Sequence, residues 1–223
     1  MSSDGGFPIA LSLRVALLAV ALVGPPGLAL AWLQARSRYP GRSLVDALVL
    51  LPLVLPPTVV GYLLVVLCGR RGPFGRALES LFDLRLVFTP AAAVIASAVV
   101  ALPLLVKTAQ PAFEAVPGEL EEAGRSLGLG PAALFLRVTL PAAWQGVAAA
   151  LVLAFARAVG EFGATLMFAG NIPGRTNTMP LELYAAWQAG DDARAFLYVA
   201  VLSGVSLAVA LLAPRLALRG LPP

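Results

Sequence analysis

Long apolar runs alternate with short polar stretches along this chain, and five of the runs are long enough to cross a lipid bilayer. A membrane-spanning helix needs about 20 consecutive apolar residues, and lipid forces a helix because it offers no partner for backbone N–H and C=O groups. We therefore predict an all-α integral membrane protein with about five transmembrane helices in a single domain, residues 1–223. The predicted spans are Ile9–Trp32, Leu44–Cys68, Val87–Val106, Val147–Gly170 and Phe196–Ala213.

A polar, amphipathic segment, residues 107–146, separates the third run from the fourth. Pro117 and the acidic residues after it predict the start of a helix. A proline fits the first turn, and carboxylates complement the positive end of the helix dipole. Arg125 is spaced to pair with Glu121 one turn earlier. Gly128 then predicts a left-handed stop.

A second short helix is expected in this segment after Gly130-Pro131, ending at Leu140-Pro141 before the next span. Two interpretations stay open. The pair of helices either lies on the membrane surface as a hairpin or forms a contact for a partner protein. Its first helix is acidic, whereas anionic headgroups favour basic helices, so the pattern favours a protein partner.

The composition supports a membrane protein and excludes several classes of enzyme. Hydrophobic residues make up 59% of the chain and charged residues 13%, against about 25% charge in soluble domains. The mean hydropathy is +0.87. The chain has no histidine and one cysteine, Cys68, which excludes His-based zinc sites, Ser-His-Asp and Cys-His catalysis, and an internal disulfide.

The one lysine, Lys107, follows no glycine-rich loop, so the sequence has no phosphate-binding P-loop. We expect no catalytic residue, metal or cofactor in this chain, and if ATP powers the protein, another chain binds it. An intramembrane enzyme would need a catalytic pair within the spans, and none is visible. The net charge of +4 suits anionic lipid headgroups and does not call for nucleic acid.

The distribution of arginine and lysine predicts how the chain is oriented. The N-terminus carries no basic residue, whereas the first loop carries Arg36, Arg38 and Arg42 and no acid. Basic loops stay in the cytoplasm. Five spans then place the N-terminus outside and the C-terminus, including Arg219, in the cytoplasm. Segment 107–146 is predicted to be cytoplasmic as well.

Two of the predicted spans carry residues that are unusual in lipid. Pro52, Pro56 and Pro57 interrupt the second span, which predicts a kinked helix whose freed carbonyls face a central path. Arg157 and Glu161 lie four residues apart in the fourth span, so they share a helix face and can pair. The pair either packs the bundle or supplies positive potential to a path for an anion.

The cytoplasmic segment carries a pattern that is typical of a known family. Permease subunits of ABC importers share Glu-Ala-Ala, three residues, Gly, nine residues and Ile-x-Leu-Pro. This chain resembles them with both spacings intact, and it departs from the pattern at Gly124 for Ala and at Val138 for Ile. The resemblance implies the type I permease fold of ABC importers, in which this element is the coupling helix that docks on the ATPase. It implies that the coupling contact includes Glu122, Ala123, Gly124, Gly128, Leu140 and Pro141.

Four further stretches resemble the molybdate permease subunits within this family. They are Leu53–Leu64, Gly69–Gly72, Gly160–Thr165 and Asn171–Thr176. Sulfate and thiosulfate permeases share the stretch around Arg157 and Glu161, so a sulfate permease of the same architecture is the nearest alternative. A passive channel is a further alternative, which dependence on the ATPase would exclude.

The resemblance implies a set of partners for the chain. A second copy would complete a translocation path for molybdate and tungstate on the two-fold axis, with Pro56, Pro57, Arg157, Gly160 and Glu161 as candidate lining residues. Two ATP-binding cassette subunits would hold the ATP and magnesium, and an extracytoplasmic molybdate-binding protein would deliver the anion. The expected location is the inner membrane of a bacterium or archaeon, in contact with the lipid bilayer.

Overall fold

The computed structural model describes residues 5–37 and 39–218, and within them the chain is helical and has no β-strand. Arg38 and Arg219, used above to predict orientation, lie outside the described residues. The helices in chain order are α1 (Gly6–Arg36), α2 (Arg42–Val54), α3 (Pro57–Cys68), α4 (Pro73–Phe82), α5 (Pro90–Glu114), α6 (Gly118–Ser126), α7 (Pro131–Leu134), the π-helix η1 (Phe135–Thr139), α8 (Leu140–Val159), α9 (Gly163–Phe168), α10 (Met179–Gln188) and α11 (Asp192–Leu218).

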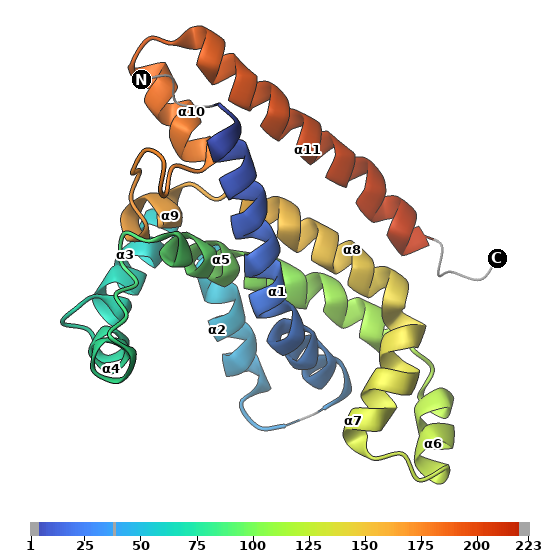
Figure 1. Ribbon diagram of the computed structural model, residues 1–223. Helices are drawn as coiled ribbons and strands as arrows, with labels where there is room; N and C mark the ends of the chain where they lie inside the picture. The colour runs from blue at the N-terminus through green and yellow to red at the C-terminus, as the bar shows by residue number, and fades with distance from the viewer. Residues whose placement is uncertain (1–4, 38, 219–223) are drawn as a thin grey trace.

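Helices α1, α5 and α8 form the centre of the bundle, with α11 against α8 (Figure 1). Their shared core is built largely of alanine, including Ala16 and Ala19 on α1, Ala101 on α5, and Ala150 and Ala154 on α8. Small residues let helices approach closely where lipid provides no hydrophobic driving force between them. The alanine-rich helices therefore pack closely against one another.

The predicted class, an all-helical membrane protein, is confirmed. Among the described residues, four helices are long and apolar enough to cross a membrane: α1, α5, the continuous helix Pro131–Val159 and α11. Helices α2 and α3 pass the same test only as a pair, bent by 110°. The chain thus has four candidate spans, or five if the bent pair counts as one.

The second predicted span, Leu44–Cys68, is broken and not merely kinked. Helix α2 ends at Val54, and both Leu55 (ψ 144°) and Pro56 (ψ 134°) have extended backbone before α3 begins at Pro57. The residue before a proline is pushed away from helical conformation. Two successive prolines apply this constraint to Leu55 and then to Pro56, which is enough to interrupt the helix.

The long helices on both sides of the predicted polar segment 107–146 extend into it. Helix α5 continues through Lys107 to Glu114, and the Lys107 ammonium lies 2.6 Å from the Asp46 carboxylate on α2. The expected end of a helix at Leu140-Pro141 is also wrong, because α7, η1 and α8 are continuous. The polar connection between the spans is therefore residues 115–130.

A local π-helix lets the chain pass the proline at position 141. The Leu140 N–H bonds the Phe135 carbonyl, five residues back. Pro141 has no N–H to donate and its ring would clash with the carbonyl four residues earlier in a regular α-helix. Widening the preceding turn relieves that clash, and such π-bulges are frequent at functional sites.

The fourth predicted span, Val147–Gly170, has the wrong bounds at both ends. It begins at Pro131 and ends at Val159, after which Gly160, Glu161 and Phe162 leave the helix. Helix α9 is a separate, short element. Arg157 therefore lies in the last turn of α8, and Glu161 lies beyond it.

Candidate functional site

Helix α6 presents an outward face suited to a partner. Leu120 is 48% exposed and Leu127 is 83% exposed, and Glu122 and Ala123 are exposed between them. Gly128 has a φ of +80° and ends the element, so the predicted left-handed stop is confirmed. Helix α6 lies at one end of the bundle (Figure 1), and Glu119 and Glu122 are exposed near these apolar side chains.

The opposite face of α6 is buried against the start of the fourth span. Glu121 and Gly124 are its buried residues. A Cβ on Gly124 would lie 2.6 Å from Leu134 Cδ1 and 3.4 Å from Val138 Cγ2. Of the sequence-predicted coupling residues, Gly124 thus faces inward, while Glu122, Ala123 and Gly128 face solvent.

The Glu121 carboxylate joins three elements. Its Oε1 accepts hydrogen bonds from Arg36 Nε at the end of α1 (3.2 Å) and from Thr139 Oγ1 in η1 (2.7 Å). Its Oε2 lies 3.8 Å from Arg125 Nη2, so the predicted pair within α6 forms. Arg36 Nη2 also donates to the Val116 carbonyl at 2.6 Å. No local pattern indicated the Arg36 contact, which bridges 85 positions.

Aromatic side chains pack the π-helix against the bundle. The Phe135 ring centroid lies 5.2 Å from that of Trp32 on α1 and 5.8 Å from that of Phe113 on α5. Tilted aromatic pairs at these separations are stabilising. The segment that holds Thr139 is therefore fixed to α1 and α5 as well as to α6.

The Arg157–Glu161 pair forms as predicted, at the opposite end of α8. Arg157 Nη2 lies 2.8 Å from Glu161 Oε2, and the Glu161 side chain is 1% exposed against 27% for Arg157. The other carboxylate oxygen accepts the Ala164 N–H of α9 at 2.8 Å. Glu161 therefore neutralises the arginine and also satisfies a free backbone donor in the first turn of α9.

The two helix breaks, which are far apart in sequence, meet in space. A Cβ on Gly163 would lie 2.9 Å from Pro57 Cβ, and a Cβ on Gly61 would lie 2.8 Å from the Ala164 carbonyl oxygen. Helices α3 and α9 pack closely as a result. The structure thus collects the candidate path residues in one region, where Pro56, Pro57 and Gly160 are exposed and Glu161 is buried.

The coupling residues and the path residues are separated by the length of α8. Its 20 residues span about 30 Å at 1.5 Å per residue. Leu140 and Pro141 belong to the first turn of this helix and not to the outward face of α6. The family pattern therefore covers two elements with different positions: the outward face of α6 and the first turn of α8.

Polar contacts hold the segment after α9 against the bundle. Asn177 Nδ2 donates to Glu182 Oε2 at 3.0 Å, and Arg194 Nη2 lies 2.7 Å from Glu182 Oε1. The Met179 N–H donates to Ser12 Oγ of α1 at 2.7 Å. These buried polar groups hold α10 against α1 and α11. Asn177 and Glu182 had no identifiable pattern in the sequence.

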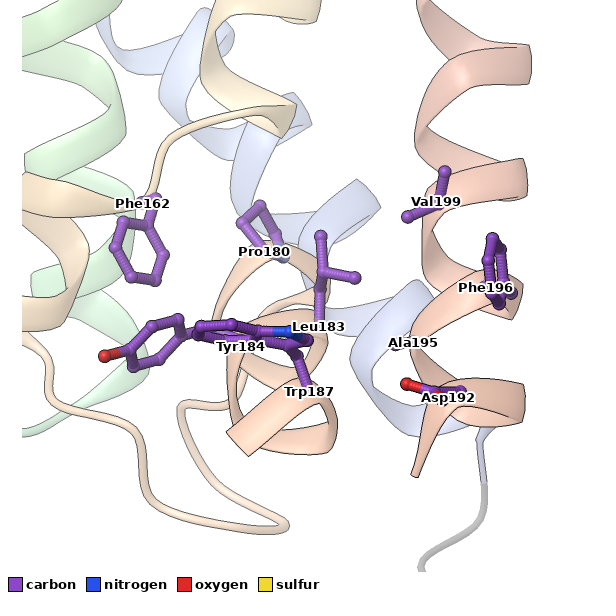
Figure 2. Close-up of a pocket in the computed structure, with 9 residues that line it drawn as sticks. All are labelled: Phe162, Pro180, Leu183, Tyr184, Trp187, Asp192, Ala195, Phe196 and Val199. Carbon is purple, nitrogen blue, oxygen red and sulfur yellow. The ribbon is translucent and has the colours of Figure 1, made fainter. Parts of the chain in front are cut away.

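A cavity of about 570 Å³ opens beside the second break, between α10 and α11 (Figure 2). Phe162, Tyr184 and Trp187 form its aromatic wall, with the Phe162 and Tyr184 ring centroids 5.5 Å apart. Phe196 and Val199 of α11 face them. Asp192 is the charged residue of its lining, and an apolar cavity with a carboxylate does not suit an anion.

Among the described residues, no group of three His, Cys, Asp or Glu side chains could hold a metal ion.

The sequence matches a described family and several curated relatives. Residues 27–219 match the family "Binding-protein-dependent transport system inner membrane component". The molybdenum transport system permease protein ModB of Escherichia coli is 44% identical over 92% of this chain and 88% of its own length. ModB of Haemophilus influenzae is 43% identical over 89% of each chain. A probable sulfate transport system permease of Nephroselmis olivacea is 37% identical over 91% of this chain and 71% of its own.

Solved structures share the fold at low sequence identity. A chain of the inward-facing MetNI methionine ABC transporter aligns with a TM-score of 0.62 at 17% identity, covering 95% of this chain and 94% of its own. A chain of a bacterial ABC transporter for alginate import aligns with a TM-score of 0.68 at 15% identity, covering 98% and 80%. At such low identities the structural similarity supports only a shared fold.

Proposed function

Because the chain belongs to the family of binding-protein-dependent transport system inner membrane components, we propose that it is the permease subunit of an ATP-driven importer for molybdate and tungstate. The observation that supports molybdate as the substrate is the 44% identity to a molybdenum permease over 92% of the chain. The outward face of α6 and the meeting of two helix breaks supply the parts that such a subunit needs.

The proposed assembly has a second copy of this chain at its centre. Along α2 only Val49 is buried, and Pro56, Pro57 and Thr58 are exposed at the start of α3. An exposed broken helix in lipid needs protein or water around it, because its freed backbone groups have no partner in hydrocarbon. A two-fold partner over α2 and α3 would supply that cover and enclose a path between the copies.

Two ATPase subunits would bind the α6 faces, and they would hold the ATP and magnesium. An external molybdate-binding protein would dock at the other end. The start of α1 lies near the start of α11, through Tyr198 and the Gly5 carbonyl, whereas the end of α1 contacts α6 through Arg36. With α6 in the cytoplasm, the N-terminal end of α1 lies outside and α11 runs inward to a cytoplasmic C-terminus.

The geometry suggests how ATP would drive transport. Closure of the ATPase pair would draw the two α6 helices together. Since α6 is tied to α1 and to the start of the fourth span, those helices would tilt as rigid bodies and open the path outward. The breaks beside Gly160 and Pro57 lie at the far end of α8, where a small tilt becomes the largest displacement. Hydrolysis would reset the assembly.

Uptake of radioactive molybdate into proteoliposomes tests the proposal. The complete complex with its binding protein should take up molybdate when ATP is enclosed and should stop when the ATPase subunit is omitted. Uptake that persists without the ATPase would indicate a passive channel. Lack of nucleotide-dependent uptake of any oxyanion would contradict the proposal as a whole.

A sulfate or thiosulfate permease is the second candidate, favoured by the 37% identity to a sulfate permease over 91% of the chain. Competition separates the two substrates. Excess sulfate should leave molybdate uptake nearly unchanged, whereas tungstate should compete. Sulfate that inhibits as strongly as unlabelled molybdate would overturn the substrate assignment and leave the transport mechanism in place.

A further inference from the structure

The carboxylate of Glu121 is the point where the coupling helix is attached to the rest of the bundle. Its side chain is 5% exposed, although the rest of α6 apart from Gly124 faces solvent. It contacts Arg36 at the end of α1 and Thr139 in η1, in addition to Arg125 within α6. A carboxylate accepts several hydrogen bonds at once, so one side chain can bind several elements.

The neighbouring glutamate has no such role. Glu122 belongs to the family pattern and is exposed, and its backbone carbonyl accepts a hydrogen bond from Ser126. Glu121 precedes the pattern and faces inward. The two adjacent carboxylates therefore have different roles: Glu122 is available to a partner protein, and Glu121 holds α6 to two spans.

The contacts of Glu121 lie at one end of each helix that they join to α6. Thr139 is fully buried and is the last residue of η1, directly before the first turn of α8. The Arg36 guanidinium binds both Glu121 and the Val116 carbonyl in the connection between α5 and α6. Hydrogen bonds between charged groups are stronger than those between neutral groups. A displacement of α6 therefore pulls on α1 and α8 at their cytoplasmic ends.

We propose that Glu121 is the positioning residue that transmits displacement of α6 to α1 and α8, and that without it ATP hydrolysis continues while the path no longer moves. The inference rests on the proposed function, because it needs a motor that moves α6. The Glu121 side chain is 5% exposed, so it acts through the residues that it contacts, of which Arg36 and Thr139 lie outside α6.

The test is the number of molybdate ions taken up per ATP hydrolysed. Glu121→Gln keeps the shape and an acceptor for Thr139 but removes the charge that holds Arg36. We expect uptake to fall at least tenfold while ATP hydrolysis stays within twofold of the unmodified complex. A role in stability alone would lower uptake and hydrolysis in proportion, and an unchanged ratio of uptake to hydrolysis would therefore overturn the proposal.

Glu114→Gln is the matched control. Glu114 is an exposed carboxylate at the end of α5 that accepts a hydrogen bond from Gln110. Its removal makes the same change in charge near the same end of the bundle, and the uptake ratio should not change. An equal fall in Glu114→Gln would assign the effect to surface charge and contradict the role of Glu121.

Milder variants keep the test decisive if Glu121→Gln does not assemble. Thr139→Val removes one hydrogen bond at nearly constant volume, and Arg36→Lys keeps the charge but loses the forked geometry. Each should lower the uptake ratio two- to fivefold in assembled complex. If both keep the original ratio, the proposal is wrong.

A second readout separates this proposal from the choice of substrate. In a Cys68→Ser background, which removes the one native cysteine, Val54→Cys places a thiol on a residue that is 77% exposed beside the first break. Trapping the ATPase with ATP and vanadate should change maleimide labelling of this thiol, and Glu121→Gln should abolish that change. This result needs no molybdate. Failure of molybdate uptake would therefore contradict molybdate as the substrate. An undiminished labelling change in Glu121→Gln would contradict the proposed role of Glu121 in transmitting movement.

Discussion

The two ends of α8 each hold a buried glutamate paired with arginine, but the two pairs are built differently. Glu161 binds Arg157 and the Ala164 N–H, partners within four residues of it. Glu121 binds Arg36, which is 85 positions away, and Thr139, which is 18 positions away. The first pair shapes one local break, whereas the second joins separate helices.

The difference shows how each end is packed. At the α6 end, polar side chains from distant elements hold the helix. At the break, backbone meets backbone: a Cβ on Gly61 would lie 2.8 Å from the Ala164 carbonyl oxygen and 2.9 Å from its Cα. The break region is therefore rigidly packed, and the following changes test that contrast in order of decreasing effect.

Gly61→Val should have the largest effect on stability. The added side chain meets the Ala164 backbone, which cannot rotate away, and overpacking of this kind costs about 3 kcal/mol or more. Denaturation of the purified protein in detergent measures the loss. A loss below about 1 kcal/mol would show that α3 and α9 can separate easily, which contradicts a rigid break.

Arg157→Gln should have the second-largest effect on stability and lower the free energy of unfolding by about 2 kcal/mol in the same measurement. The variant removes the charge that compensates Glu161, which is 1% exposed, while the glutamine amide still donates a hydrogen bond. If Arg157 also supplies positive potential to the anion path, molybdate uptake should fall in complexes that still assemble. Unchanged uptake would assign the pair to packing.

Glu161→Gln should lower the free energy of unfolding by about 1 kcal/mol, less than Arg157→Gln. Arg157 is 27% exposed and can turn toward water, and the amide oxygen can still accept the Ala164 N–H. Removing a negative charge beside the path should maintain or raise uptake if Arg157 attracts the anion. A fall in uptake equal to that of Arg157→Gln would favour packing for both residues.

Gly124→Ala should have the smallest effect, within about 1 kcal/mol of the original protein. The new methyl group meets Leu134 Cδ1 at 2.6 Å, which is the end of a flexible side chain, and replacing a helical glycine by alanine gains about 0.5–1 kcal/mol. The family pattern itself has alanine here. A thermal midpoint lowered as much as in Gly61→Val would remove the contrast between the two ends.

Much of this molecule could be predicted from local sequence. The Pro117 start, the acidic first turn and the left-handed Gly128 produced α6 as expected. The pairing of Arg157 with Glu161 was also predicted, because partners four residues apart can meet whether or not the helix continues between them. These features depend on interactions within about one turn, which a sequence shows directly.

The errors came from features that depend on distant partners. Hydropathy placed the fourth span through Gly170, but Gly160 ends α8 and α9 packs against α3 from the other break. The proline at position 141 was expected to end a helix, and a π-helix braced by Trp32 and Phe113 carries the chain past it. A local rule could not include stabilisation from other helices.

The sequence by itself determined the membrane class, the family and the outward face of α6, because hydrophobic length and a strictly spaced pattern are properties of the chain alone. Only the tertiary structure decided that Glu121 faces inward to Arg36 and Thr139 while Glu122 faces outward. Adjacent residues of one type have nearly the same local signal. Their roles separate only when helices from distant parts of the chain pack around one of them.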